Sequence, residues 1–179
     1  MLKRRLGVSR MPHDAAMNHA HSAPPATAAG GVLSRTSFRA SFDNVRLAIE
    51  RAVVAMAPLN LTEEEQSSVE IVLAEALNNV VEHAYDRDNP GDIKLVLRHG
   101  RAGLLVEIRD AGKPMPNGRT PVGDHPSTHL PANEIPEGGF GWFLIRELAR
   151  DLIYDRENGE NFLIFRLAVG QRAQRVSSK

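Results

Sequence analysis

The sequence contains no cysteine. Disulfides, thiolate metal sites and cysteine nucleophiles are therefore excluded, and the composition is compatible with a reducing cytosol. No run of about 18 apolar residues occurs, so no transmembrane helix is predicted. Lys3, Arg4 and Arg5 are not followed by the apolar segment of a signal peptide. Together these absences predict a cytoplasmic protein without a membrane partner.

An excess of charge of one sign is also missing, because 22 basic side chains balance 22 acidic ones. The chain therefore has no global electrostatic attraction for nucleic acid, and we expect no direct nucleic-acid partner. At 179 residues, it is long enough for one domain with a single hydrophobic core and a tail.

Composition divides the chain into three regions. Residues 1–34 are rich in proline, alanine and glycine and lack periodic bulky apolar residues, which predicts a disordered N-terminal tail. Its histidines have no carboxylate or thiol partners in the pattern and are weak evidence for a metal site. Residues 35–169 form the predicted domain, and residues 170–179 are expected to be a frayed C-terminus.

The domain shows alternating strand and helix patterns. A helix is expected from Phe42 to just before Pro58, and Thr62 with Glu65 forms a capping box that opens a long helix ending near Tyr85. A short helix is expected over residues 142–150. Strands are predicted over residues 36–40, 93–98, 104–109, 152–155 and 161–167, the last four as two hairpins.

The long helix carries an apolar stripe with a polar ridge at its edge. Glu75, Asn79 and His83 are spaced four residues apart, so a regular helix places them one above another. Polar groups beside a core are costly to bury unless something pairs with them, which indicates a ligand or metal site. On this helix alone the alternative stays open that the three side chains only bond neighbouring loops.

Two further segments carry chemistry. Asp110 ends a predicted strand and is followed by Gly112, although aspartates at such positions often only cap turns. Residues 113–139 are rich in proline and poor in bulky apolar groups, which predicts a flexible lid. The lid ends in Gly138, Gly139 and Gly141 before a helix, an arrangement that suits phosphate but is often only a turn.

The three pieces in this order resemble the GHKL superfamily of ATP-binding domains (the Bergerat fold), and within it the anti-sigma-factor serine kinases. The matching residues are Glu75-x-x-x-Asn79-x-x-x-His83-Ala84, then Asp110-x-Gly112, then Gly138-Gly139-Phe140-Gly141-Trp142-x-Leu144-Ile145. The resemblance covers roughly residues 36–167. It implies an α/β (α+β) two-layer sandwich, with a mixed, largely antiparallel sheet and three helices on one face.

The resemblance also implies roles for these residues. Asn79 matches the asparagine that ligates Mg²⁺ between the phosphates of ATP, and Glu75 matches the base that activates the attacking hydroxyl. Asp110 matches the acceptor for the adenine amino group, and Gly112 lets the backbone pass close to the base. The phosphates are wrapped by the lid segment Gly138, Gly139, Phe140 and Gly141, and His83 packs beside Asn79.

Two departures from the family pattern stand out. Lys113 and Pro114 follow Gly112 where many members have a further glycine, and Pro114 removes a backbone donor. Trp142 and Phe143 are bulkier than the usual start of the last helix. We expect these aromatic residues to be core, with a partner-facing patch as the alternative.

The function implied is an ATP-dependent anti-sigma factor. It would bind a sigma factor and phosphorylate a serine or threonine on the anti-anti-sigma antagonist, in transcription regulation of a stress response, as a homodimer through the first strand and helix. The alternative is an ATP-binding switch that sequesters a partner with little or no kinase activity. A histidine kinase, a larger GHKL machine and an ATP-free domain are less favoured by the sequence.

Overall fold

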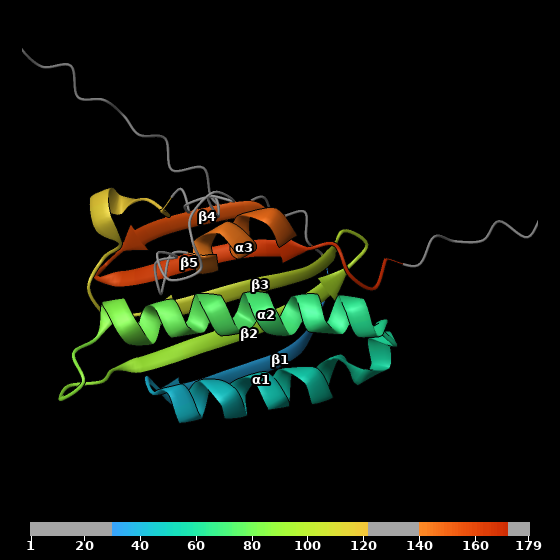
Figure 1. The fold of residues 1–179 in the computed structure, drawn as a ribbon, viewed down its shortest axis with the longest axis horizontal. Coiled ribbons are helices and arrows are strands. Elements are labelled where there is room, and N and C mark those ends of the chain that lie inside the picture. Colours follow the sequence, from blue (N-terminus) through green and yellow to red (C-terminus); the bar gives the residue numbers. More distant parts are fainter. Residues whose placement is uncertain (1–29, 122–139, 172–179) are drawn as a thin grey trace, which may run out of the picture.

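The computed structural model describes residues 30–121 and 140–171. Its strands are β1 (Gly31–Arg39), β2 (Asp92–Gly100), β3 (Gly103–Asp110), β4 (Ala149–Glu157) and β5 (Glu160–Leu167). They form one sheet in the order β1-β2-β3-β5-β4, and all four pairings are antiparallel. The helices α1 (Phe42–Met56), α2 (Glu63–Asn79) and α3 (Phe140–Leu148) lie together on one face of this sheet (Figure 1). The expected two-layer fold is confirmed, with a sheet that is antiparallel throughout the described residues rather than mixed.

The hydrophobic core fills the space between the sheet and the helices. In β2, β3 and β5 alternate residues are buried, so each strand turns one face to the helices and the other to solvent. The predicted apolar stripe of α2 is confirmed, because its side chains at the sheet are fully buried: Val69, Val72, Leu73, Ala76 and Leu77. Burial of this stripe holds α2 in place and fixes which of its polar residues lie at the core's edge.

Side-chain caps define where the first two helices begin. The Ser41 side chain accepts a hydrogen bond from the backbone of Asn44 at the start of α1. The predicted capping box of α2 is confirmed: the Thr62 N–H donates to Glu65 Oε2 at 2.9 Å, and the Glu65 N–H donates to Thr62 Oγ1 at 3.1 Å. A cap of this kind stabilises a helix by about 1 kcal/mol. None of the described helices is long and apolar enough to cross a membrane.

The first strand is longer than the sequence pattern indicates. β1 begins at Gly31 and pairs with β2 from Gly31 opposite His99 to Arg39 opposite Asp92. It therefore includes residues 31–34, which we expected in the tail. The cause is backbone pairing along an edge strand, which needs no alternation of apolar side chains. The rest of the expected tail (residues 1–29) and most of the expected frayed end (172–179) lie outside the described residues.

The long helix changes character at Asn79, where α2 ends and a π-helical turn, η2 (Val80–Ala84), continues to the turn before β2. We expected a regular helix up to Tyr85. A π-helical turn holds more residues than an α-helical one, so positions four apart no longer stack beyond Asn79. His83 is accordingly turned outward, with 70% of its side chain exposed.

The remaining elements agree with the sequence patterns, except that residues 149–150, expected at the end of the short helix, begin β4 instead. The two predicted hairpins are β2–β3 and β4–β5, and the predicted short helix is α3. A short 3-10 helix, η1 (Ala57–Leu59), follows α1, and another, η3 (Pro116–Gly118), lies in the first part of the predicted lid. Residues 122–139 of that lid lie outside the described residues.

Candidate nucleotide site

A cavity of about 440 Å³ lies where the end of α2, the end of β3 and the start of α3 meet. Cavities of this size hold small molecules in other proteins. Its apolar walls include Val80, Ala84, Met115, Trp142 and Leu163. Its polar lining includes Asn79, His83, Asp110, Tyr154 and Asn161. The structure thus brings the predicted helix residues Asn79 and His83 to the predicted strand-end residue Asp110.

Asn79 is oriented by its own helix. Its side-chain Nδ2 donates to the backbone carbonyl of Glu75, one turn earlier, at 2.7 Å. A carbonyl can only accept, so the amide nitrogen must face Glu75, and Oδ1 is left as an acceptor on a residue that lines the cavity. An amide oxygen is a hard ligand of the kind Mg²⁺ takes together with phosphates and water. The residue therefore fits the predicted metal role, and the described part of the chain holds no cluster of three or more His, Cys, Asp or Glu residues that could form another site.

Glu75 lies beside the first turn of α3. A Cβ placed on Gly141 would overlap Glu75 Oε2 and lie 3.2 Å from Glu75 Cδ, so a larger residue at this position would displace the carboxylate. Within the described residues the half-buried carboxylate has no hydrogen bond or ion pair, which leaves its oxygens available to accept a hydrogen bond. It lies one turn from Asn79 but does not itself line the cavity.

Of the other residues predicted to contact the phosphates, the structure describes some and not others. His83 lines the cavity with its ring mostly exposed and 3.8 Å from Glu82. Phe140 is the half-buried first residue of α3. Gly138 and Gly139 lie outside the described residues, so their predicted phosphate contacts are not tested.

Asp110 is the buried acceptor at the floor of the cavity, with 6% of its surface exposed. Its Oδ1 accepts from the Gly112 N–H at 2.9 Å and from Asn161 Nδ2 at 2.8 Å. Burial raises the pKa of this carboxyl, while those two hydrogen bonds and the Arg156 guanidinium oppose the rise and Glu160 adds to it. No described residue bonds Oδ2, so one oxygen is left for a donor such as an exocyclic amino group.

Gly112 is needed for space against the helix end. A Cβ at this position would overlap the Ala84 carbonyl oxygen and lie 2.7 Å from Ala84 Cβ. The next residue, Lys113, donates its backbone N–H to the same Ala84 carbonyl at 2.8 Å. The close approach expected of Gly112 is therefore present, and its partner in the structure is the last turn of η2. Glycine at this position therefore allows the segment that follows β3, which forms one wall of the cavity, to pack directly against η2.

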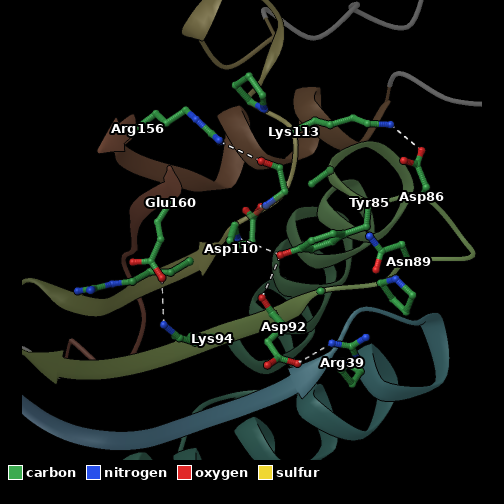
Figure 2. A pocket seen from close by; sticks show the side chains of 17 residues that line it. Arg39, Tyr85, Asp86, Asn89, Asp92, Lys94, Asp110, Lys113, Arg156 and Glu160 are labelled. Atoms are coloured by element: carbon green, nitrogen blue, oxygen red, sulfur yellow. Dashed lines mark hydrogen bonds and ion pairs between the residues drawn. The ribbon is translucent and has the colours of Figure 1, made fainter. Parts of the chain in front are cut away.

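A second, larger hollow of about 690 Å³ adjoins this cavity and shares Ala84, Asp110, Lys113 and Pro114 with it. Figure 2 shows three of its cations paired with neighbouring acids, whereas Arg156 donates to the Gly112 carbonyl. The ion pairs are Arg39–Asp92 at 3.6 Å, Lys94–Glu160 at 3.1 Å and Lys113–Asp86 at 2.6 Å. Because these three pairs neutralise their own charges, the hollow is a poorer phosphate site than its size suggests.

Several residues that line the smaller cavity were not predicted from the sequence, among them Asn161, Tyr154 and Met115. Asn161 is the second residue of β5, just after a turn, and asparagine is itself common in turns, while Tyr154 fits an ordinary strand pattern. Met115 lies in the proline-rich segment and gave no signal. Asp110 and Asn161 become neighbours only because β3 pairs with β5 in the register that places these two residues opposite each other. Trp142, expected in the core, is buried and also lines the cavity.

A three-helix layer on an antiparallel sheet, with an asparagine and a buried aspartate lining one cavity, is the arrangement expected of the ATP-binding domains that the sequence resembles. The family model of the histidine kinase-like ATPase domain matches residues 38–167, and the chain belongs to this family. Membership implies that the domain binds ATP. The residues matched begin within β1 and end with β5, so the family covers nearly all of the described fold.

Curated relatives are more distant. The chain is 29% identical over 103 residues to the serine-protein kinase RsbW of Bacillus cereus (strain AH820), an alignment of 56% of this chain and 63% of that protein. It is 29% identical over 101 residues to the serine-protein kinase RsbW of Halalkalibacterium halodurans, covering 56% of this chain and 62% of that protein. The chain thus spans less than two thirds of the relatives it matches, and their activity does not transfer with the family.

Proposed function

We propose that the protein is an ATP-dependent anti-sigma factor that binds a sigma factor and phosphorylates a serine or threonine on the anti-anti-sigma antagonist. The observation that carries this proposal is the pair of groups on α2. Asn79 lines the cavity with its amide nitrogen bonded to the Glu75 carbonyl, which leaves Oδ1 as an acceptor, and the Glu75 carboxylate, which has no hydrogen bond or ion pair among the described residues, lies one turn away. The similarity to proteins named serine-protein kinases supports protein phosphorylation over other uses of ATP.

Each residue would have a simple task. Asp110 accepts a hydrogen bond from the adenine amino group through Oδ2, and Asn79 holds Mg²⁺ through Oδ1. The ion, when bound, neutralises charge on the phosphates of the nucleotide. Glu75 accepts the proton of the attacking hydroxyl. His83 and the glycines Gly138, Gly139 and Gly141 remain proposed contacts of the cofactor.

A homodimer through β1 and α1 is part of the proposal. β1 is an edge strand, so its outer backbone groups have no partner strand in this sheet. α1 exposes large apolar side chains, with Phe42 at 52%, Leu47 at 42% and Val54 at 74%. Apolar groups beside an open strand edge support association there. The cytoplasmic location expected from the sequence remains a prediction.

The second candidate is an ATP-binding switch that sequesters a partner with little or no phosphotransfer. It is supported by the position of Glu75, which lies beside α3 and outside the lining of the cavity that Asn79 faces. A base that does not reach the terminal phosphate would leave nucleotide binding intact and transfer slow.

A timed assay with radiolabelled ATP, the full chain and a candidate antagonist separates the two functions. Transfer of label to a serine or threonine that disappears in Glu75→Ala supports the kinase. Bound ATP without transfer supports the switch. A pulldown from the host cytosol with and without ATP, followed by identification of the retained proteins, supplies the candidates and tests for a sigma factor among them.

A further inference from the structure

Asn161 is a buried amide, 4% exposed, that lies directly opposite Asp110 in the sheet. A buried amide is costly unless its donors and acceptor are satisfied. Its Nδ2 donates to Asp110 Oδ1 at 2.8 Å and to the Lys113 carbonyl at 3.1 Å. Its Oδ1 accepts from the Tyr154 hydroxyl at 2.8 Å and from the Arg156 guanidinium. Asn161 therefore uses both ends of its amide to join β3, β4 and β5 at the cavity.

These partners leave Asn161 one orientation. Arg156 can only donate, so the amide oxygen must face it, and the amide nitrogen must face Asp110. Asp110 then receives two donors on Oδ1, from Asn161 and Gly112, and keeps Oδ2 for a ligand. Reversing the amide would put two acceptors together and is disfavoured.

The same network reaches the chain that follows β3. The Tyr154 hydroxyl, which donates to Asn161, accepts the backbone N–H of Met115 at 3.0 Å. Arg156 donates to the Gly112 carbonyl at 3.0 Å, a contact visible in Figure 2. The hydrogen bonds thus run in one direction, from Met115 through Tyr154 and Asn161 to Asp110. Met115 and Asp110 both line the cavity, at its wall and at its floor.

We propose that Asn161 and Tyr154 are positioning residues that couple recognition of the adenine amino group by Asp110 to placement of the cavity wall at residues 112–115. The inference rests on the proposed binding of ATP in this cavity and adds residues that act through Asp110 without catalysing transfer. Chains of hydrogen bonds in a low-dielectric interior strengthen one another, so loss of one member weakens the rest.

The prediction concerns base selectivity as well as affinity. Purine riboside triphosphate lacks the 6-amino group and cannot donate to Asp110 Oδ2. A residue that acts by orienting Asp110 should therefore matter for ATP and matter little for this analogue. A residue that only supports the fold should weaken both nucleotides to the same degree.

Tyr154→Phe removes only the hydroxyl and is the first test. We expect ATP affinity to fall about 3- to 10-fold, the usual effect of losing one hydrogen bond, with little change for purine riboside triphosphate. Asn161→Ala removes the contact with the carboxylate itself, and we expect a loss of about 10- to 100-fold for ATP alone.

Tyr85→Phe is the matched control. The Tyr85 hydroxyl also accepts a backbone N–H of this segment, that of Ala111 at 2.9 Å, but it donates to the Asp92 carbonyl on the side of the second hollow (Figure 2). We expect its ATP selectivity to equal that of the unaltered protein.

Calorimetric titrations measure the affinity of each full-length variant for ATP and for purine riboside triphosphate. A smaller ATP-to-analogue affinity ratio in Tyr154→Phe and Asn161→Ala, but not in Tyr85→Phe, supports the proposal. Unchanged ratios in both, with the unaltered protein preferring ATP, overturn the coupling and leave the proposed function in place. Absence of ATP binding by the unaltered protein overturns the proposed function and this inference with it.

Discussion

Replacing Gly112 by alanine tests how closely the wall of the cavity must approach η2. The added methyl would overlap the Ala84 carbonyl oxygen and lie 2.7 Å from Ala84 Cβ, and neither is the end of a flexible side chain. The backbone must therefore move. That movement breaks the Lys113–Ala84 hydrogen bond of 2.8 Å. Overpacking and one lost hydrogen bond together cost about 2–4 kcal/mol of unfolding free energy.

Urea unfolding of Gly112→Ala measures this cost, with an unchanged m value indicating that the unfolded state is the same. Gly31→Ala is the matched control, because a Cβ at Gly31 meets nothing within 4 Å. Its unfolding free energy should stay within about 0.5 kcal/mol of the unaltered protein. ATP affinity should fall in Gly112→Ala only, since the Gly112 N–H also bonds Asp110. If Gly112→Ala and Gly31→Ala had equal unfolding free energies, the close approach of Gly112 to Ala84 would be refuted.

Three further predictions concern the site. Glu75→Ala should retain ATP affinity in calorimetry but lose phosphotransfer, and full activity would assign the base to another residue. Gly141→Ala should keep or slightly raise stability, by up to about 1 kcal/mol, because alanine favours a helix and the group in its way is the end of a flexible side chain. It should slow transfer by displacing Glu75, and an unchanged rate contradicts that contact. Asp110→Asn should abolish ATP binding. Because burial raises the pKa of Asp110, folding favours the protonated form, and stability is lost as the pH rises through that pKa. The variant should therefore gain stability relative to the unaltered protein between acidic and neutral pH in urea unfolding, and parallel curves would contradict the shift.

Local patterns were sufficient for much of the fold. The capping box at Thr62 and the apolar stripe of α2 depend on residues close in sequence, and both are present as predicted. The two hairpins also follow from turn residues between alternating strands. Such features are specified by neighbours three or four positions away, which is the range a sequence pattern reports.

Features that depend on tertiary context were not predictable. The π-helical turn after Asn79 changes the direction of the polar ridge, and no residue type announces it. The early start of β1 depends on pairing with β2, which supplies hydrogen bonds to residues without an alternating pattern.

The candidate site shows the same division. Asn79 and Asp110 were found because each stands in a recognisable local motif, and the structure places both at one cavity. Asn161 and Tyr154 have ordinary surroundings in the sequence, and their importance arises only from strand pairing across the sheet. Polar residues that are satisfied by distant partners give no periodic signal.

We propose that the Asn79 amide oxygen would hold Mg²⁺ together with the nucleotide, and the rest of the proposed chemistry depends on this contact. Calorimetric titration of ATP with and without Mg²⁺ tests it in Asn79→Ala and in the matched variant Asn78→Ala, which removes the neighbouring amide that does not line the cavity. We predict that Mg²⁺ increases ATP affinity in the unaltered protein and in Asn78→Ala, and that the increase is lost in Asn79→Ala. An equal magnesium effect in all three proteins would contradict the account.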